Sequence, residues 1–393
     1  MKKMAAGAEG MVSFADDQWK LRRNIVAPFY SEDTIQSLIP IISHHIGPML
    51  RDLSARGLVQ TFGCQSILSY HILLITLKTS FGLKNIGHPM EAELIVAGTR
   101  SLDHLFDQFF RFYTWSNHHL KLYNWFYGIT DERAALIEIA KQIVKMRLTE
   151  QERNPLTSET DLNGESGRND QAFLDYMLEE FMDCGVLTNE GLESLVGELL
   201  TMSTINFETI LDSVTWFLHN MACNQSIQME LYHEIVDFDV DALTYERIDE
   251  LTFFDQCIRE NLRIRPPIAN VFRMVDEDVT LDGHVIPKGI LSVTFIYSIH
   301  HDENIYPEPE KFDPSRFAPE NITKIPPGAY IPFGNGPRRC IGEKMALLES
   351  KIILLSILKK FWITPVENDE TQVRIDLLTR PKKPLKLRFT PRF

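Results

Sequence analysis

The chain has 393 residues, and its 40 Lys and Arg stand against 54 Asp and Glu, which gives a net charge of −14 at pH 7. This acidic balance argues against broad electrostatic binding of nucleic acid, because phosphate neutralisation needs surplus lysine and arginine. Hydrophobic residues make up 44% of the chain and charged residues 24%, which is typical of a globular protein and excludes a disordered one.

Helices are predicted along most of the chain, because Leu, Ile and Val recur at spacings of three and four. The predicted helices cover residues 17–27, 33–60, 65–82, 131–149, 189–222, 247–264 and 343–361. Thr188 and Asn189 are candidate caps of the longest helix. The stretch 102–127 is crowded with aromatic residues, and residues 151–170 have the polar composition of a loop.

A short β region follows the helices. Residues 279–286 are β-prone and surround Asp282-Gly283, which predicts a tight hairpin. Residues 302–332 are rich in proline and without periodicity, so we expect irregular backbone there. The N-terminus has two lysines and no apolar run behind them, and no run approaches the ~20 apolar residues of a spanning helix. As given, the chain is expected to be soluble or only peripherally attached to a membrane.

The strongest chemical pattern lies in residues 333–342, FGNGPRRCIG. Glycines permit tight turns and close approach of the backbone to a ligand. Cys340 precedes a predicted helix, whose N-terminal dipole favours a thiolate, and a thiolate in such a place can ligate haem iron. Arg338 could bind a carboxylate. The alternative is a buried cysteine beside a glycine-rich turn; a dinucleotide loop fits poorly, because the glycines lack its spacing.

Phe333, Gly334, Gly336, Arg338, Cys340 and Gly342 resemble the cysteine loop of the cytochrome P450 family of haem-thiolate monooxygenases. The resemblance implies a mainly α fold with a small β portion, forming a single domain over residues 1–393. It also implies haem b as cofactor, with Cys340 as the axial ligand of the iron and Phe333 beside the cofactor.

Two further patterns accompany the loop. Glu260 and Arg263 resemble the ExxR motif of the family and share one helix face, where they can pair. Arg316 resembles the arginine that completes a Glu–Arg–Arg triad, although Ser315 stands where the family often has glutamate. A buried ion network is costly unless every member is paired, so we expect the triad to fix the cysteine loop. The alternative for Glu260 and Arg263 is an exposed helix pair.

Basic and aromatic residues resemble the partners of the two haem propionates, which need charge-assisted donors. They are Trp19, Arg23, Arg273 and Arg338. Taken singly, Trp19 and Arg23 also suit an ordinary amphipathic helix.

The oxygen site resembles the family less closely. Glu208 and Thr209 keep the acid and the alcohol that can relay protons to bound dioxygen, although such a pair can also face water or back-bond to the helix. Ile205 and Asn206 replace the small residues that the family usually has there. These changes put ordinary oxygen activation in question and would suit a haem-thiolate isomerase or dehydratase that acts on a peroxide without a reductase.

The resemblance begins near Met11, roughly at the third lettered helix of the family, so the sequence reads as an N-terminally truncated form that lacks the anchor helix, the first helices and the first sheet strands. The strands expected near 271–274 and 290–295 would then lack partners, which is an aggregation hazard. An inactive truncated isoform is therefore one alternative.

The main expectation is a monooxygenase that inserts one oxygen atom of O2 into an apolar fatty acid, steroid or xenobiotic. The resemblance implies electrons from NADPH through NADPH-cytochrome P450 reductase, and a place on the cytosolic face of the endoplasmic reticulum membrane with peripheral contact, or in the cytoplasm if the anchor is missing. The paired histidines at 300 and 301 lack the spacing of zinc ligands.

Overall fold

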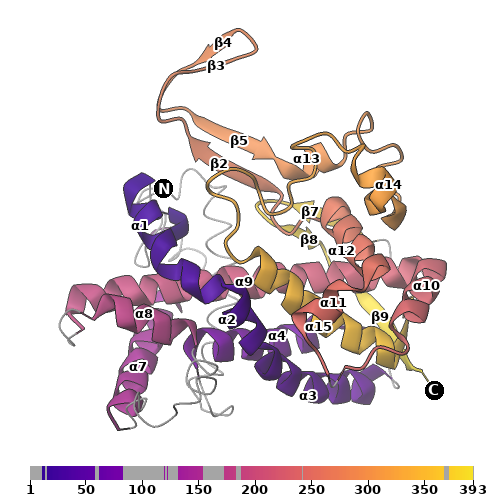
Figure 1. Cartoon of the computed structure of the whole chain (residues 1–393), viewed down its shortest axis with the longest axis horizontal. Coiled ribbons are helices and arrows are strands. Elements are labelled where there is room, and N and C mark those ends of the chain that lie inside the picture. The colour runs from indigo at the N-terminus through magenta and orange to yellow at the C-terminus, as the bar shows by residue number, and fades with distance from the viewer. Residues whose placement is uncertain are drawn as a thin grey trace. The chain divides into compact units, whose positions relative to one another are not determined.

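The structure is a computed structural model of the chain. It describes residues 11–13, 16–57, 62–82, 119, 122, 132–153, 172–182, 187–240, 242–366 and 371–392. Helices dominate it, with small sheets among them (Figure 1). The chain divides into two compact units, Met1–Gly47 with Ser69–Glu208, and Pro48–Leu68 with Thr209–Phe393. Each is described by itself below, and the single domain expected from the sequence stays a prediction.

The first unit is helical in its described part. It contains η1 (Met11–Ser13), α1 (Asp16–Val26), η2 (Ala27–Tyr30), α2 (Glu32–Ser37), α7 (Glu132–Arg153) and α8 (Phe173–Phe181), with parts of α3 (Ile39–Gly57), α4 (Gln65–Phe81) and α9 (Asn189–Cys223). Phe29 packs edge-on against Phe173, with ring centroids 5.1 Å apart. Arg147 of α7 donates to both carboxylate oxygens of Asp175 in α8, at 2.8 and 2.9 Å.

Most helices predicted for this part of the chain are confirmed, with two changes. The helix expected over 33–60 is divided at Leu38, and Pro40 takes the second position of α3, where a missing N–H costs least. α7 continues through Arg153, so the first residues of the loop expected at 151–170 are helical. Residues 154–171 lie outside the described residues. The aromatic stretch 102–127 also lies outside them, except for positions 119 and 122.

The second unit combines helices with small antiparallel sheets. Its helices are the later parts of α3 and α9, the first residues of α4, α10 (Gln225–Ile235), α11 (Tyr245–Asp249), α12 (Thr252–Ile264), α13 (Ile296–His300), η4 (Pro314–Phe317), α14 (Pro319–Ile322) and α15 (Glu343–Lys360). β1 (Phe62–Gly63), β9 (Lys386–Pro391) and β6 (Phe361–Pro365) form one sheet in that order. β7 (Val373–Ile375) pairs with β8 (Thr379–Pro381).

The hairpin predicted at 279–286 is confirmed as β3 (Val279–Leu281) and β4 (His284–Ile286), which Figure 1 shows beyond the neighbouring pair of strands. Asp282 and Gly283 both have positive φ, as a two-residue turn of this kind requires. The expectation of unpaired strands near 271–274 and 290–295 is wrong. β2 (Asn270–Met274) and β5 (Leu291–Phe295) pair with each other along their full length.

The core of the second unit holds α9, α12 and the C-terminal strands together. Phe217 and Phe254 pack edge-on at 5.9 Å, and the Trp216 indole donates to the Thr379 carbonyl at 2.8 Å. The helix expected over 247–264 is split into α11 and α12 around Leu251. The Glu234 carboxylate of α10 accepts from two backbone amides in the first turn of α12, which satisfies a helix N-terminus at that point.

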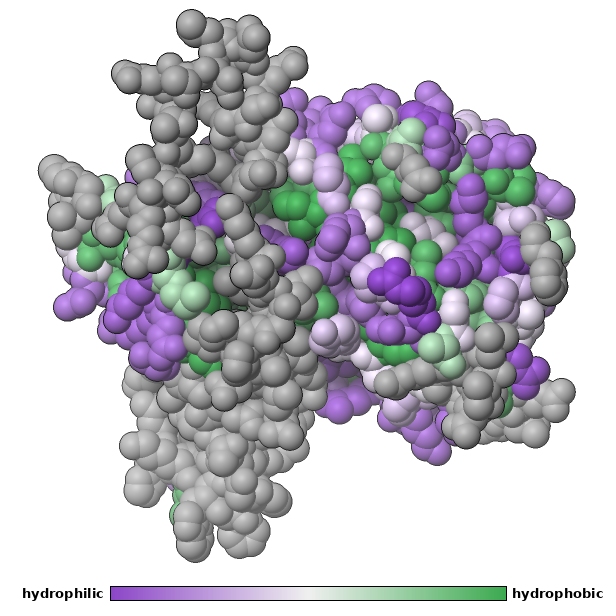
Figure 2. All heavy atoms as spheres, turned by 90° about the horizontal axis from the view of Figure 1, so that it is seen from below, coloured by the Kyte–Doolittle hydropathy of each residue, from purple (hydrophilic) through white to green (hydrophobic). Residues whose placement is uncertain are grey.

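Hydrophilic and hydrophobic side chains are interspersed over the face shown in Figure 2. Among the helices that the structure describes, none combines the length and the apolar composition needed to cross a membrane.

Candidate functional site: a buried ion network beneath an exposed cysteine loop

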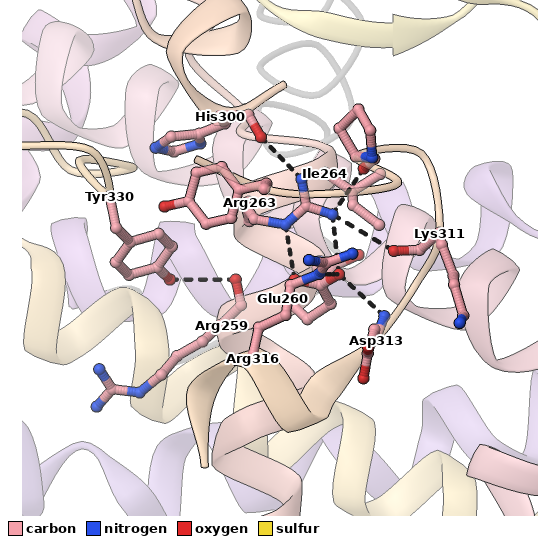
Figure 3. A network of polar contacts seen from close by, with 12 residues as sticks. Arg259, Glu260, Arg263, Ile264, His300, Lys311, Asp313, Arg316 and Tyr330 are labelled. Atoms are coloured by element: carbon pink, nitrogen blue, oxygen red, sulfur yellow. Dashed lines mark hydrogen bonds and ion pairs between the residues drawn. The ribbon is translucent and has the colours of Figure 1, made fainter. Parts of the chain in front are cut away.

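Glu260 and Arg263 lie on the buried face of α12 and form a bidentate ion pair (Figure 3). The Arg263 Nε donates to Glu260 Oε2 at 2.7 Å, and Nη2 donates to Oε1 at 2.9 Å. Both side chains are fully buried. The exposed helix pair considered from the sequence is therefore wrong, and two parallel charge-assisted bonds fix the geometry of the pair.

The other donors of Arg263 reach carbonyls outside α12. Nη1 donates to the His300 carbonyl at 2.7 Å, and Nη2 donates to the Pro309 carbonyl at 2.7 Å. The guanidinium also lies over the Tyr306 ring, 5.0 Å from its centroid. One arginine thus ties the end of α13 and the backbone at Pro309 to α12, which suits its rigid fork of five donors.

Arg316 of η4 joins the same carboxylate more loosely. Its Nε lies 3.4 Å from Glu260 Oε1, and its Nη2 donates to the carbonyls of Pro307 and Glu308 at 2.6 and 3.1 Å. The Asp313 amide donates to the same Glu260 oxygen at 2.9 Å. The structure therefore brings Glu260, Arg263 and Arg316 together, with Arg263 as the closer partner.

Burial is the dominant influence on the titration of this network. It raises the pKa of Glu260 above the ordinary value, although Arg263, the Asp313 amide and Arg316 all favour the carboxylate. Burial likewise raises the pKa of Tyr306 to about 12, so its phenol stays protonated and donates to the Ala329 carbonyl at 3.0 Å. The Glu260–Arg263 pair is therefore shielded from solvent, and each charge depends on the other.

The cysteine loop is held by backbone hydrogen bonds. The Gly334 amide donates to the Ile331 carbonyl at 2.9 Å, and the Cys340 amide donates to the Phe333 carbonyl at 3.0 Å. Gly334 and Gly336 both have φ of 74°, a conformation that other residues rarely adopt. Among the described residues, a Cβ added at either glycine would meet nothing within 4 Å, so backbone conformation, and not space within the chain, requires glycine here.

α15 begins three residues after Cys340, which stands exposed at the end of the loop. Arg339 donates to both carboxylate oxygens of Glu343 in the first turn of that helix, at 2.6 and 2.7 Å. These bonds raise the pKa of Arg339, so it remains charged beside the cysteine. The buried cysteine that the sequence left as an alternative is wrong for Cys340.

These residues fit a haem. The thiol of Cys340 is exposed, and the space in front of Gly334 and Gly336 would admit a flat ligand close to the backbone. Arg338 is half-buried in the loop, and Arg273 is exposed on β2, so this unit offers guanidinium groups for carboxylates. Phe333 is half-buried beside the glycines.

The remaining predicted residues lie on α1 and α9. Trp19 is buried, and the Arg23 guanidinium lies over its ring at 5.7 Å, so the two share one face of α1. Glu208 is buried and Thr209 half-buried on α9, where Asn206 is half-buried and Ile205 exposed.

An exposed cysteine at the end of a glycine loop, three residues before a long helix, together with a buried Glu–Arg pair, is the arrangement expected of a haem-thiolate protein. The family model of Cytochrome P450 matches residues 2–389. The chain belongs to the cytochrome P450 family, whose members are haem-thiolate monooxygenases.

Relatives and a solved structure agree with this assignment. The chain is 26% identical to Cytochrome P450 4c3 of Drosophila melanogaster over 98% of its own length and 74% of the relative. It is 28% identical to Cytochrome P450 4V2 of Pongo abelii, covering 95% and 72%, and 28% identical to Cytochrome P450 3A12 of Canis lupus familiaris, covering 96% and 74%. The fold matches retinoic acid-bound cyanobacterial CYP120A1 with a TM-score of 0.79 at 22% identity, over 99% of this chain and 82% of that one. The mainly α P450 fold expected from the sequence is confirmed.

Several residues of the site were not predicted. The Arg339–Glu343 pair has i, i+4 spacing and could have been found from the sequence. His300, Tyr306 and Tyr330 come from the proline-rich region and its border, and periodicity gives no signal for them because their partners lie far away in the chain.

Proposed function

We propose that this chain is a monooxygenase that inserts one oxygen atom of O2 into an apolar small molecule of the fatty acid, steroid or xenobiotic class. The observation that carries the proposal is the exposed Cys340 on a glycine loop at the start of α15, in a chain that belongs to the P450 family.

The residues that would hold haem b follow from their chemistry. Cys340 would ligate the iron through its thiolate, and Arg338 and Arg273 would pair with the propionates, together with Trp19 and Arg23 of α1. When bound, the haem supplies the activation of dioxygen, and thiolate ligation favours O–O cleavage. Glu260, Arg263 and Arg316 would act at a distance, by keeping the backbone below the loop in one conformation.

Proton delivery is assigned to Glu208 and Thr209 on α9. A buried carboxylate beside an alcohol can bind a water molecule and relay a proton from it. The hydroxyl can both accept and donate a hydrogen bond in such a relay. Electrons would come from NADPH through NADPH-cytochrome P450 reductase. The resemblance to microsomal-type relatives supports a place at the cytosolic face of the endoplasmic reticulum membrane, with peripheral contact.

A second function is favoured by the residues around the acid–alcohol pair. Ile205 and Asn206 add bulk and an amide to a turn of α9 where the family usually has small residues. Such a site would suit isomerisation or dehydration of a peroxide, which needs haem and thiolate and no electron donor.

Substrate turnover under oxygen-18 separates these functions. Haem-loaded protein with reductase and NADPH, offered a fatty acid, a steroid and a xenobiotic in turn, is expected to give product that carries one labelled oxygen atom. Conversion of a fatty acid hydroperoxide without reductase, with no label incorporated, would support the isomerase instead. Cys340→Ser serves as the control that must abolish either activity.

A further inference from the structure

His300, the last residue of α13, contacts the ion network through its carbonyl (Figure 3). Its ring contacts the backbone that leads into the cysteine loop. Its carbonyl accepts from Arg263 Nη1 at 2.7 Å, and its ring Nε2 lies 2.9 Å from the Ile331 amide. The ring stacks on Tyr330 with centroids 5.5 Å apart and planes tilted by 21°. The side chain is fully buried.

The bond to Ile331 fixes the protonation of the imidazole. A backbone amide can only donate, so Nε2 must carry a lone pair, and the single proton of the neutral ring lies on Nδ1. Burial, together with the positive charge of Arg263, lowers the pKa of His300 to about 3, and His301 adds to this effect. Arg263, His301 and the neutral Tyr330 are the titratable groups that face the ring from the packed elements.

The contact continues to the proposed iron ligand through two backbone bonds. The Ile331 carbonyl accepts from Gly334, and the Phe333 carbonyl accepts from Cys340. The preceding residues are also held, since Tyr330 donates its hydroxyl to the Arg259 carbonyl of α12 at 3.2 Å. Ile331 is thus the point at which the loop meets the buried network.

We propose that neutral His300 is a positioning residue for Cys340, which holds Ile331 against the Glu260 network and releases the cysteine loop when it is protonated. The inference rests on the proposed function in that Cys340 is the haem ligand. The imidazole touches no reacting atom and acts through the register of the loop.

Three variants separate the hydrogen bond from the volume of the side chain. His300→Gln keeps an oxygen that can accept from Ile331 and cannot be protonated, whereas His300→Leu fills similar space and accepts nothing. His301→Gln is the matched control, because the neighbouring imidazole contacts Tyr297 and Glu310 instead. All are made in the full chain.

Amide hydrogen exchange of the haem-free protein reads the loop directly. Loss of the hydrogen bond to the part-buried Ile331 amide is expected to raise the opening equilibrium of residues 331–340 roughly tenfold in His300→Leu at pH 7.5, with His300→Gln and His301→Gln close to wild type. The opened loop frees His300 to titrate near 6.5. Opening in the wild type should therefore rise about tenfold per pH unit below that value, and stay nearly level in His300→Gln.

The thiolate-type Soret band of reduced, carbon monoxide-treated protein gives the second reading. On acidification, wild type and His301→Gln are expected to lose this band at a higher pH than His300→Gln does. The inference would be overturned if residues 331–340 exchanged equally slowly in wild type and His300→Leu. It would also be overturned if wild type and His300→Gln lost the Soret band at the same pH. If the wild type shows no such band at any pH, the proposed function fails instead, and the exchange measurement still judges His300.

Discussion

Two ion networks on α12 differ in how deeply their carboxyl groups are buried and in which segments they join. Glu260 is fully buried and binds Arg263, Arg316 and a backbone amide of the irregular segment. Asp255, five positions earlier, is partly exposed and binds Arg259 at 2.5 Å and Lys351 of α15 at 3.0 Å. The first network binds the end of α13 and the irregular backbone before η4 to α12, whereas the second joins two regular helices.

The pKa values of the two carboxyl groups move in opposite directions for this reason. At Glu260 burial outweighs the arginines and raises the pKa. At Asp255 burial also acts to raise the pKa, but Lys351 and Arg259 together outweigh it and lower the pKa. Ion pairs of similar composition thus differ because the Glu260 carboxyl is fully buried, whereas the Asp255 carboxyl is partly exposed to solvent.

Removal of Glu260 should have the largest effect. Glu260→Ala leaves Arg263 buried without its carboxylate, and such a loss costs about 3–5 kcal/mol. Denaturant unfolding of the haem-free protein measures it, and the yield of haem-loaded protein should fall with it. Glu260→Gln keeps an acceptor for the Asp313 amide and is expected to lose less. A loss below about 1 kcal/mol in Glu260→Ala would remove the distinction between the networks.

Acid should weaken the deeper network first. The pKa of His300 is about 3 in the folded chain and about 6.5 unfolded. Its contribution is therefore complete above 6.5 and is lost as pH falls toward 3, by about 1.4 kcal/mol per pH unit. The difference in unfolding free energy between wild type and His300→Gln should follow this slope from pH 6.5 to 4.5. A difference independent of pH would show that His300 is not buried neutral.

Removal of one partner from the Asp255 network should cost less unfolding free energy than removal of Glu260. Lys351→Met removes a buried ammonium but leaves Asp255 paired with Arg259, so the expected loss of unfolding free energy is about 1 kcal/mol. Asp249 also pairs with Lys351, at 3.2 Å, yet is 62% exposed. Asp249→Asn is the control and should change stability by less than about 0.5 kcal/mol. A loss as large as that of Glu260→Ala would contradict the comparison.

Thr209→Ala should leave both networks intact and change stability least. Thr209 lies half-buried on α9, and alanine favours the helix. If it relays protons, the haem-loaded variant should release more hydrogen peroxide per NADPH consumed than the wild type, at nearly unchanged unfolding free energy. Unchanged coupling of NADPH consumption to product would remove Thr209 from the relay.

Local patterns predicted what depends on near neighbours. The Glu260–Arg263 spacing placed both residues on one helix face, and Asp282-Gly283 gave the hairpin, because each pattern is complete within a few residues. α10 was not predicted, and the gap between α11 and α12 was also missed, since Glu234 of α10, which accepts from the first turn of α12, lies far from it in the sequence. The pairing of β6 with β9 was also missed, since such pairing joins residues far apart in sequence.

The sequence predicted which residues belong to the site better than which atoms they contact. Family resemblance named Arg316, yet the carbonyls of residues 300, 307 and 309 that the two arginines bind have no side-chain pattern that could reveal them. Lys351 and Asp255 lie on different helices that are far apart in the chain, so charge patterning along the sequence could not pair them.

Ligation of haem iron by Cys340 is the claim on which the proposed chemistry depends. The most direct test is the Soret spectrum of the purified, haem-supplied chain after reduction and carbon monoxide treatment, beside Cys340→Ser. The wild type is expected to give the thiolate-type band and the serine variant to lose it. A folded wild type without that band, or a serine variant that keeps it, would contradict the assignment.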